Sequence, residues 1–300
     1  MSNVNYFLKS GGKVLGENGP FELGRLVRSP SVPKRAYLRG NAALLHAKPT
    51  VGIVGTRKPS ALGLKRAFDY AATLTNAGCL IVSGGALGID YAAHRGALSV
   101  GGETLSVLGD PVFENRDERP RRILDLAPSE LVTTVTTYGP GTKLGKTLFV
   151  ARNQYIAALS DAIVIIEGML NSGTLHTARY AAKIGVPVWA IPGDPDNPLA
   201  EAANFLLASS DARPLLNTNA LIESLGLNIA EPTPEPAVAE GEGEIWEAFK
   251  SNNGRVTLDL LCEMLKVPIF QIQSDLLELE LMGTIQREGA EFVWQNRSLS

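Results

Sequence analysis

Six short apolar segments alternate with amphipathic segments between residues 50 and 193, and this alternation is the strongest constraint on the fold. The apolar segments are 50–56, 79–85, 103–109, 131–138, 162–168 and 187–193, and helical patterns over 62–77, 88–101, 149–160 and 173–185 separate most of them. Strands that are joined through helices, without hairpin turns, pair in parallel. The sequence therefore predicts an α/β fold: a Rossmann-like, doubly wound, mostly parallel sheet with helices on both faces.

A stretch rich in Pro, Glu and Gly, EPTPEPAVAEGEGE, offers almost nothing to bury and indicates a linker. Helical patterns at EIWEAFKSN, VTLDLLCEMLK and FQIQSDLLELELMG follow it, and two short strand patterns end the chain, which is the layout of a winged helix. We predict four regions: a lead-in with little fold of its own over 1–45, a Rossmann-like domain over 46–228, a flexible acidic linker over 229–243, and a winged-helix domain over 244–300.

The net charge of the 300-residue chain is -3, so a site for a polyanion has to be a local concentration of basic side chains. Cys79 and Cys262 stand far apart in apolar runs, which favours buried free thiols over a disulfide or a metal pair. The first residues lack the apolar core of a signal peptide, and no run reaches transmembrane length. These features predict a cytoplasmic protein without a membrane contact.

Glycine-rich stretches stand where the predicted strands end: Gly55-Thr56-Arg57, Ser83-Gly84-Gly85, Ser172-Gly173-Thr174 and Pro192-Gly193. In a doubly wound sheet, ligands bind beyond the carboxyl ends of the strands. Backbone N–H groups and helix dipoles at such places favour anions, although each glycine alone equally suits a tight turn. Together they predict a ligand that carries phosphate. The basic residues Arg57, Lys143, Lys146 and Arg152, with Asn153, are candidates to contact it.

The sequence gives less support to three more specific sites: a P-loop, a catalytic nucleophile and a metal site. GPGTKLGKT, residues 139–147, has Pro140 where a nucleotide-binding P-loop requires glycine. A nucleophile set of Ser83, His94 and Asp90 lacks the G-x-S-x-G turn, and the other histidines have no partners at metal-ligand spacing. Glu167 could contact a ligand or cap a loop. The sequence thus predicts no catalytic residues, no metal and no cofactor.

With these residues in place, the chain resembles the DprA/Smf family of DNA-processing proteins. The family's apolar strand followed by G-[ST]-R matches Val51–Arg57, and its S-G-L-A-x-G-I-D…A-H-x-G-A-L run matches SGGALGIDYAAHRGAL. Its P-G-T…F-P-x-R-N-R stretch matches GPGTKLGKTLFVARNQ, and its V-V-V-E-A…S-G-[ST]-L-x-T-A matches IIEGMLNSGTLHTA. The matches run in order over about residues 37–226.

The resemblance implies a protein that binds single-stranded DNA without strong sequence preference, loads the RecA recombinase during natural transformation, is not an enzyme, and forms a homodimer through the Rossmann domain. An exposed Phe149 could stack a base. Gln154 replaces the second arginine of the family motif and Val150 its proline, which alters affinity or binding mode. The expected strand-contacting residues are Gly55, Thr56, Arg57, Ser83, Gly84, Lys143, Lys146, Phe149, Arg152, Asn153, Ser172, Gly173 and Thr174.

Two further expectations concern function. A nucleotide-binding enzyme or sensor of the related phosphoribohydrolase-like fold is the alternative, but its catalytic glutamate is missing from Leu175-His176-Thr177. The winged helix has five basic residues (Lys250, Arg255, Lys266, Arg287 and Arg297) against nine acidic ones over 244–297. Its predicted recognition helix carries Asp275, Glu278 and Glu280 and no base, so we expect it to contact protein and not duplex DNA.

Overall fold

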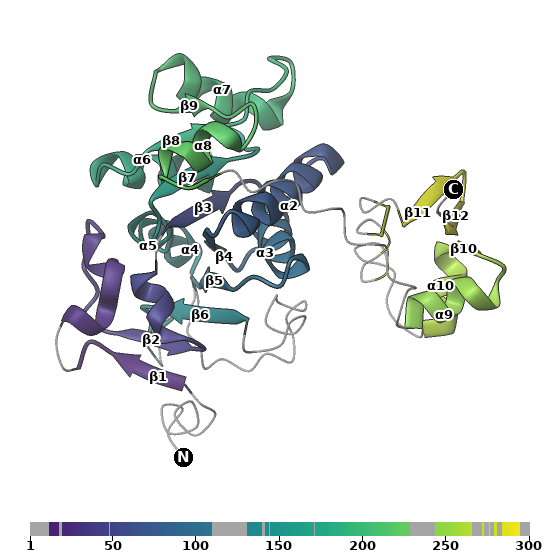
Figure 1. Cartoon of the computed structure of the whole chain (residues 1–300), viewed down its shortest axis with the longest axis horizontal. Helices are drawn as coiled ribbons and strands as arrows, with labels where there is room; N and C mark the ends of the chain where they lie inside the picture. Colours follow the sequence, from purple (N-terminus) through teal and green to yellow (C-terminus); the bar gives the residue numbers. More distant parts are fainter. Residues whose placement is uncertain are drawn as a thin grey trace. The chain divides into compact units, whose positions relative to one another are not determined.

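The chain divides into two compact units, Met1–Ala230 and Glu231–Ser300 (Figure 1). The computed structural model describes residues 12–17, 20–47, 49–109, 131–139, 142–143, 145–170, 172–228, 244–265, 272, 276, 279–280 and 284–294. The predicted linker, residues 229–243, lies outside the described residues.

A nine-stranded sheet runs through the first unit in the order β1-β2-β6-β5-β4-β3-β7-β8-β9. All strands from β6 to β9 in this order are parallel. After β3 the chain builds β4, β5 and β6 on one side and then returns to β7 on the other side of β3, so the topological switch lies between β3 and β7. The predicted mostly parallel sheet is confirmed, with strands β3 (Thr50–Val54), β4 (Leu80–Gly84), β5 (Thr104–Val107), β6 (Val132–Thr136), β7 (Ala162–Ile165), β8 (Val188–Ala190) and β9 (Arg213–Pro214).

Helices cover both faces of this sheet (Figure 1). Alternate residues of the strands supply the two cores: Val51 and Ile53 pack with one set of helices, and Ile163 and Ile165 with the other. At Gly52 a Cβ atom would lie 2.6 Å from the Ser160 hydroxyl, so glycine lets a helix approach β3 closely. One face carries α2 (Ala61–Asn76), α3 (Ile89–Ser99) and α8 (Asn219–Ser224), and the other carries α5 (Asn153–Leu159), α6 (Gly173–Lys183) and α7 (Glu201–Ala208).

The N-terminal residues join this unit, so the prediction that residues 1–45 have little fold of their own is wrong for the described part from residue 12 onward. β2 (Ala36–Arg39) pairs antiparallel with β6, and β1 (Gly12–Leu15) pairs antiparallel with β2. The 3-10 helix η1 (Pro20–Arg28) packs its buried leucines into the core beside α5, and the short 3-10 helix η2 (Ala42–His46) follows β2.

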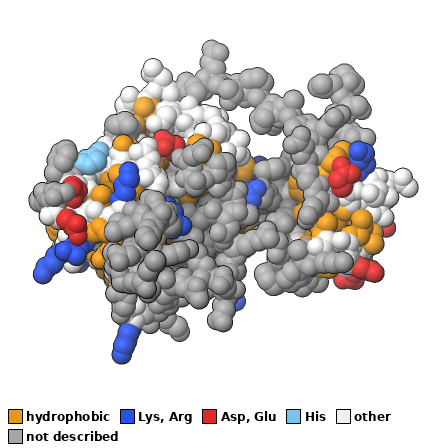
Figure 2. Space-filling model, turned by 90° about the horizontal axis from the view of Figure 1, so that it is seen from below, with side chains coloured by type: hydrophobic (Ala, Val, Ile, Leu, Met, Phe, Trp, Pro, Cys, Tyr) orange, Lys and Arg blue, Asp and Glu red, His pale blue; other side chains and the backbone are white. Residues whose placement is uncertain are grey.

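Basic side chains are scattered on one face of the molecule. On the face shown in Figure 2, the Lys and Arg side chains of the described residues form no continuous patch. This distribution agrees with the net charge of -3, so a site for a polyanion depends on where individual cations lie and not on the charge of the whole chain.

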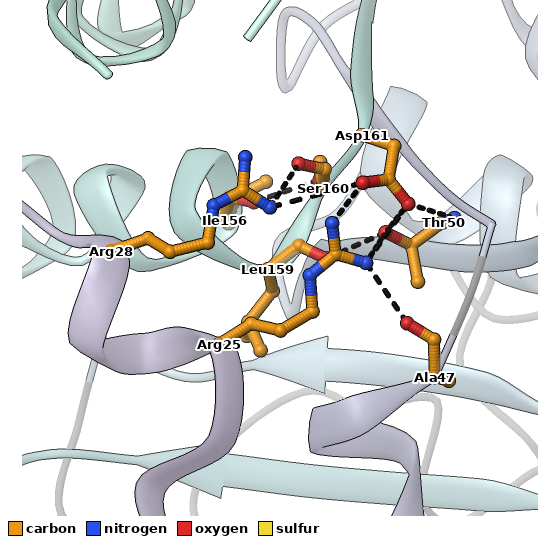
Figure 3. Close-up of polar contacts among 8 residues, drawn as sticks. All are labelled: Arg25, Arg28, Ala47, Thr50, Ile156, Leu159, Ser160 and Asp161. Atoms are coloured by element: carbon orange, nitrogen blue, oxygen red, sulfur yellow. Dashed lines mark hydrogen bonds and ion pairs between the residues drawn. The ribbon is translucent and has the colours of Figure 1, made fainter. Parts of the chain in front are cut away.

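A polar cluster fastens η1 to the amino edge of the sheet (Figure 3). Arg25 donates from Nη1 to Asp161 Oδ2 and to Thr50 Oγ1, each at 2.9 Å, and its Nη2 pairs with the second carboxylate oxygen. Arg28 reaches the same turn, donating to the Ser160 carbonyl at 3.3 Å. Because Thr50 begins β3 and Asp161 precedes β7, this cluster holds the N-terminal segment against the two central strands.

The second unit has the predicted winged-helix layout and its own core, which includes Phe249, Leu261 and Phe292. Residues 255–257 pair with the last strand, and the second predicted helix therefore begins only at Leu258. The third predicted helix, over 270–283, lies mostly outside the described residues. The elements are α9 (Glu244–Ser251), β10 (Arg255–Thr257), α10 (Leu258–Leu265), β11 (Ile285–Glu288) and β12 (Glu291–Trp294), and the sheet order is β10-β12-β11.

The cysteines and the helix lengths can be compared with what the sequence predicts. Cys79 and Cys262 are both free thiols, and Cys79 is buried. None of the helices in the described residues combines the length and the apolar character that a membrane crossing needs.

Candidate nucleic-acid interface

The loop after β3 lies at the centre of the carboxyl edge of the sheet, at the topological switch. Its Thr56 N–H donates to the Glu167 carbonyl after β7 at 2.8 Å. The Thr56 carbonyl in turn accepts from the Ile89 N–H at the start of α3, at 3.2 Å. The loops that follow β3, β4 and β7 are therefore fastened together, as the position of Gly55-Thr56-Arg57 in the sequence predicts.

Two glycines in these loops are required by close packing. Gly88 has a φ of 87°, and a Cβ there would lie 2.5 Å from the Thr56 carbonyl oxygen. A Cβ on Gly55 would lie 2.6 Å from Ile89 Cγ1 and 2.9 Å from the Glu167 carbonyl oxygen. These contacts set the path of the loop, and they leave the Arg57 side chain exposed to solvent.

Arg57 and Phe149 come together, although they are far apart in the chain. The Arg57 guanidinium carbon lies 5.4 Å from the centre of the Phe149 ring, a cation–π distance. Phe149 belongs to α4 (Lys146–Ala151) and is half-buried, and a Cβ on Gly109 after β5 would lie 2.7 Å from its Cδ1. The ring thus joins the loops after β3 and β5, and it holds an exposed guanidinium at this edge.

Arg152 does not face solvent, which corrects the prediction that it contacts phosphate. Its side chain is 5% exposed; Nη1 donates to the Val107 carbonyl at the end of β5, and Nη2 lies 3.9 Å from Asp90 Oδ2. A Cβ on Gly84 would overlap both the guanidinium and the Asp90 carboxylate. The predicted helix over 149–160 is divided into α4 and α5 at Arg152. Arg152 therefore joins the ends of β4 and β5 to α3 and α4 from beneath the surface.

Ser83 and Gly84 are also buried and serve the same packing, so they do not offer groups to a ligand. The Ser83 hydroxyl donates to the Ile53 carbonyl at 2.5 Å. The Gly84 carbonyl lies 3.1 Å from His94 Nε2, while the other His94 nitrogen lies 2.7 Å from the Thr104 hydroxyl. Burial lowers the pKa of His94 to about 4, so this histidine is neutral at pH 7. Because the His94 nitrogens are engaged by Gly84 and Thr104, the nucleophile set that includes Ser83 is not assembled.

The start of α6 supplies a second part of the edge. Gly173 is exposed and Ser172 is half-buried at the amino end of this helix. Asn153 and Thr174 are buried, and Asn153 donates to the Gly173 carbonyl at 3.0 Å, so Asn153 supports this turn and does not point outward. The predicted contacts at Asn153 and Thr174 are thus corrected to supporting positions.

The two predicted lysines belong to the segment that precedes Phe149. Lys143 is exposed to solvent. Lys146 is the first residue of α4, and its side chain lies outside the described residues. Lys143 therefore remains available at the surface as a cation for a phosphate ligand.

The amino end of α2 is closed by an acidic side chain, Glu167. Its carboxylate accepts from the Ser60 N–H at 2.9 Å and from the Ser60 hydroxyl at 2.5 Å. From the sequence alone, Glu167 can either contact a ligand or cap a loop, and in the structure its carboxylate accepts from Ser60 at the start of α2. The positive end of the α2 dipole at the switch point is thus already paired with a carboxylate.

Gln154 points away from the edge. This side chain, which stands where the family motif has a second arginine, is buried and accepts a hydrogen bond from the Ser29 hydroxyl at 3.0 Å. The substitution therefore adjusts the contact between α5 and the N-terminal segment. The sequence does not indicate this role of Gln154, because Ser29 lies far from it along the chain.

Comparisons with known proteins agree with this architecture. The sequence model of the family described as "DNA recombination-mediator protein A" matches residues 20–226, and that of the "DprA winged helix domain" matches residues 229–290. The chain is 32% identical over 270 residues to the "Putative DNA processing protein DprA" of Mycobacterium tuberculosis, covering 86% of this chain and 68% of that protein. It is 29% identical to "Protein Smf" of Synechocystis, covering 86% of this chain and 74% of that protein.

Two solved structures share the fold. DNA processing protein A of Helicobacter pylori, described for its single-stranded DNA binding mode, superposes with a TM-score of 0.62 at 28% identity, over 71% of this chain and 95% of that one. DprA of Streptococcus pneumoniae superposes with a TM-score of 0.63 at 29% identity, over 73% of this chain and 77% of that one. The family match covers most of both units, and the chain therefore belongs to the DprA/Smf family of DNA-processing proteins.

Proposed function

We propose that this chain binds single-stranded DNA along the carboxyl edge of its sheet, without strong sequence preference, and loads the RecA recombinase onto the bound strand in natural transformation. The observation that carries the proposal is the Arg57–Phe149 pair, in which an exposed guanidinium is held over an aromatic ring between two loops. An unpaired strand offers phosphates and base faces together, and this pair can meet both.

The proposed contact residues are a subset of those expected from the sequence. Arg57 and Lys143 are exposed cations, and Gly173 is an exposed turn at the start of α6, where backbone N–H groups can meet a phosphate. The buried Arg152, Ser83 and Asn153 support these positions from below. We assign contacts to Gly55, Thr56, Arg57, Lys143, Lys146, Phe149, Ser172 and Gly173.

The geometry disfavours the alternative of a mononucleotide enzyme. A mononucleotide at the switch point would place its phosphate at the amino end of α2, where the Glu167 carboxylate already accepts from Ser60. Leu175-His176-Thr177 also lacks the glutamate that the related phosphoribohydrolases use. Release of adenine from AMP by the purified chain would reinstate that alternative.

We assign recombinase loading and a homodimer through the Rossmann-like unit on family membership, and a protein-contacting winged helix on its excess of acidic residues. In the winged helix, Arg255 lies 3.0 Å from a Glu288 oxygen and 3.2 Å from a Glu291 oxygen, so acids at the surface partly neutralise this base. Loading is tested by RecA-dependent strand exchange on DNA coated with a single-strand-binding protein. The proposal expects faster exchange when the chain is added, and an unchanged rate would reject the loading role.

Binding itself is tested by fluorescence anisotropy with labelled oligo-dT and with a duplex of the same length, over a series of salt concentrations. Single-strand binding should be tighter at every salt concentration, and its affinity should fall as salt rises because phosphate contacts release counterions. Equal affinity for the two probes would reject a single-strand site.

A further inference from the structure

The loops around the switch point expose an unusual share of apolar side chains. The described part of the first unit exposes eight large hydrophobic side chains, and four of them lie in these loops or at the start of α2: Leu62 (54% exposed), Leu87 (52%), Met169 (52%) and Leu170 (42%). A single exposed leucine is ordinary, but several in neighbouring loops mark a binding surface.

Each of the four adjoins a residue that contacts the loop after β3. Leu87 precedes Gly88, whose backbone packs against the Thr56 carbonyl and the Arg57 backbone. Met169 and Leu170 follow the turn whose Glu167 carbonyl accepts from Thr56. Leu62 lies in the first turn of α2, next to Gly63, whose N–H donates to the Ser60 hydroxyl oxygen of that loop at 2.9 Å. The four residues therefore belong to segments that contact the 55–60 loop, and we call them the apolar rim.

The charge beside the apolar rim indicates its ligand. Arg57 and Lys58, both in the 55–60 loop, are exposed, and one acid, Glu201, accepts from the Leu170 N–H at 3.3 Å. A polyanion whose bases are unpaired needs cations for its phosphates and apolar surface for its base faces, since stacked or packed bases lose water. A duplex hides its base faces and offers its phosphates and the base edges in its grooves. Apolar and cationic side chains at one edge thus fit an unpaired polynucleotide.

We infer that the apolar rim, centred on Leu87 and Met169, contacts nucleobases of the bound strand, while Arg57 and Lys58 contact its phosphates. This inference rests on the proposed function and adds a subsite to it. A second copy of this chain seated on the same surface is the competing occupant. Self-association would depend on the apolar side chains but not on the bases of a DNA probe. A comparison of probes with and without bases therefore distinguishes the two occupants.

The test compares oligo-dT with an oligonucleotide of the same length whose sugars carry no bases. Both are titrated by anisotropy with the full chain, with Leu87→Ala, with Met169→Ala and with the control Leu216→Ala. Leu216 is 74% exposed and follows β9, which β7 and β8 separate from β3. All three substitutions change exposed side chains, so the fold is expected to tolerate them.

The full chain should bind oligo-dT about tenfold more tightly than the abasic probe, and Leu87→Ala and Met169→Ala should each weaken oligo-dT binding about three- to tenfold. Abasic binding and the salt slope should not change, and Leu216→Ala should bind as the parent. Equal affinity of the parent for both probes would overturn the inference. So would equal losses on both probes, or variants that change only the sedimentation of the free protein. If the parent fails to bind oligo-dT at all, the proposed function itself fails.

Discussion

Hydrogen bonds between Glu167 and Ser60 connect the loop after β7 to the start of α2, next to the point where the order of strands along the sheet reverses. The Glu167 carboxylate, just after β7, accepts from the Ser60 N–H and hydroxyl, and Ser60 caps α2 by accepting from the Gly63 N–H at 2.9 Å. A carboxylate at the amino end of a helix is stabilised by the helix dipole. A Cβ at Gly63 would overlap the carboxylate, so the sequence around the cap is adapted to it.

Replacing Glu167 by alanine should lower the free energy of unfolding of the first unit by about 2 kcal/mol. The change leaves the Ser60 N–H without its carboxylate partner and weakens the start of α2. Urea unfolding followed by circular dichroism measures this effect, with Glu223→Ala on α8 as the control because Glu223 is exposed. Equal stability of the two variants would contradict the capping role.

Arg152 should act on DNA binding through position and not through its own charge. Arg152→Ala leaves Asp90 buried without its partner, and we expect a loss of about 3 kcal/mol in stability. Arg152→Lys keeps the charge but loses the planar fork, so it should fold and bind more weakly with the salt slope of the parent. The neutral variant Arg152→Gln should likewise keep the parent salt slope, and a slope reduced by about 0.7 in Arg152→Gln would instead indicate a direct phosphate contact.

The Arg25–Asp161 pair predicts a dependence of stability on pH. Burial opposes ionisation of Asp161, but the hydrogen bonds from Arg25 and Thr50 outweigh it and lower its pKa. A carboxylate with a lowered folded pKa stabilises the fold above its unfolded pKa of about 3.9, and this stabilisation is lost as the pH falls through the folded value. Asp161→Asn should therefore cost about 2 kcal/mol at pH 7, and the difference from the parent should shrink below about pH 4.

Urea titrations of the parent and Asp161→Asn at pH 7, 5, 4 and 3 measure that difference. Asp211→Asn serves as the control, because Asp211 is exposed in the turn after α7 and its carboxylate accepts only from the exposed Ser209 hydroxyl among the side-chain contacts of the described residues. A difference between parent and Asp161→Asn that stays constant down to pH 3 would mean that the carboxylate is not stabilised by the arginine.

The winged helix should contribute nothing to duplex binding. Because Arg255 is paired with Glu288 and Glu291, Arg255→Ala in the full chain should leave duplex affinity unchanged, within the non-specific range of about 10⁻⁴ to 10⁻⁶ M. Glu288→Gln combined with Glu291→Gln frees the base and should tighten duplex binding about threefold. Anisotropy with a labelled duplex measures both, and weaker binding by Arg255→Ala would show that the unit does contact duplex DNA.

The parallel sheet was predictable from the sequence because strands such as Thr50–Val54 are buried on both faces and read as unbroken apolar runs. β1 and β2 were not predictable in this way. They are four residues long, and β2 pairs through Tyr37 with Thr136, nearly a hundred residues away. Such pairing depends on tertiary contacts, which local periodicity does not carry.

The candidate site shows the same division. The position of Arg57 directly after a strand predicted its place at the carboxyl edge. Its contact with Phe149 joins this predicted loop to the start of the predicted helix over 149–160. The burial of Arg152 was not predictable, because an arginine early in a helix is exposed unless a distant carboxylate, here Asp90, receives it. The apolar rim was not predictable for a related reason: whether Leu87 is exposed depends on how its loop folds.

Arg57 is the residue whose exposed guanidinium we propose to bind single-stranded DNA at the switch point. The most direct measurement is the salt dependence of oligo-dT affinity for the parent, for Arg57→Ala, and for Lys183→Ala at the far end of α6. We predict that Arg57→Ala lowers the affinity several-fold and reduces the slope of log K against log salt by about 0.7, while Lys183→Ala matches the parent. Parent affinity and parent slope in Arg57→Ala would contradict the claim.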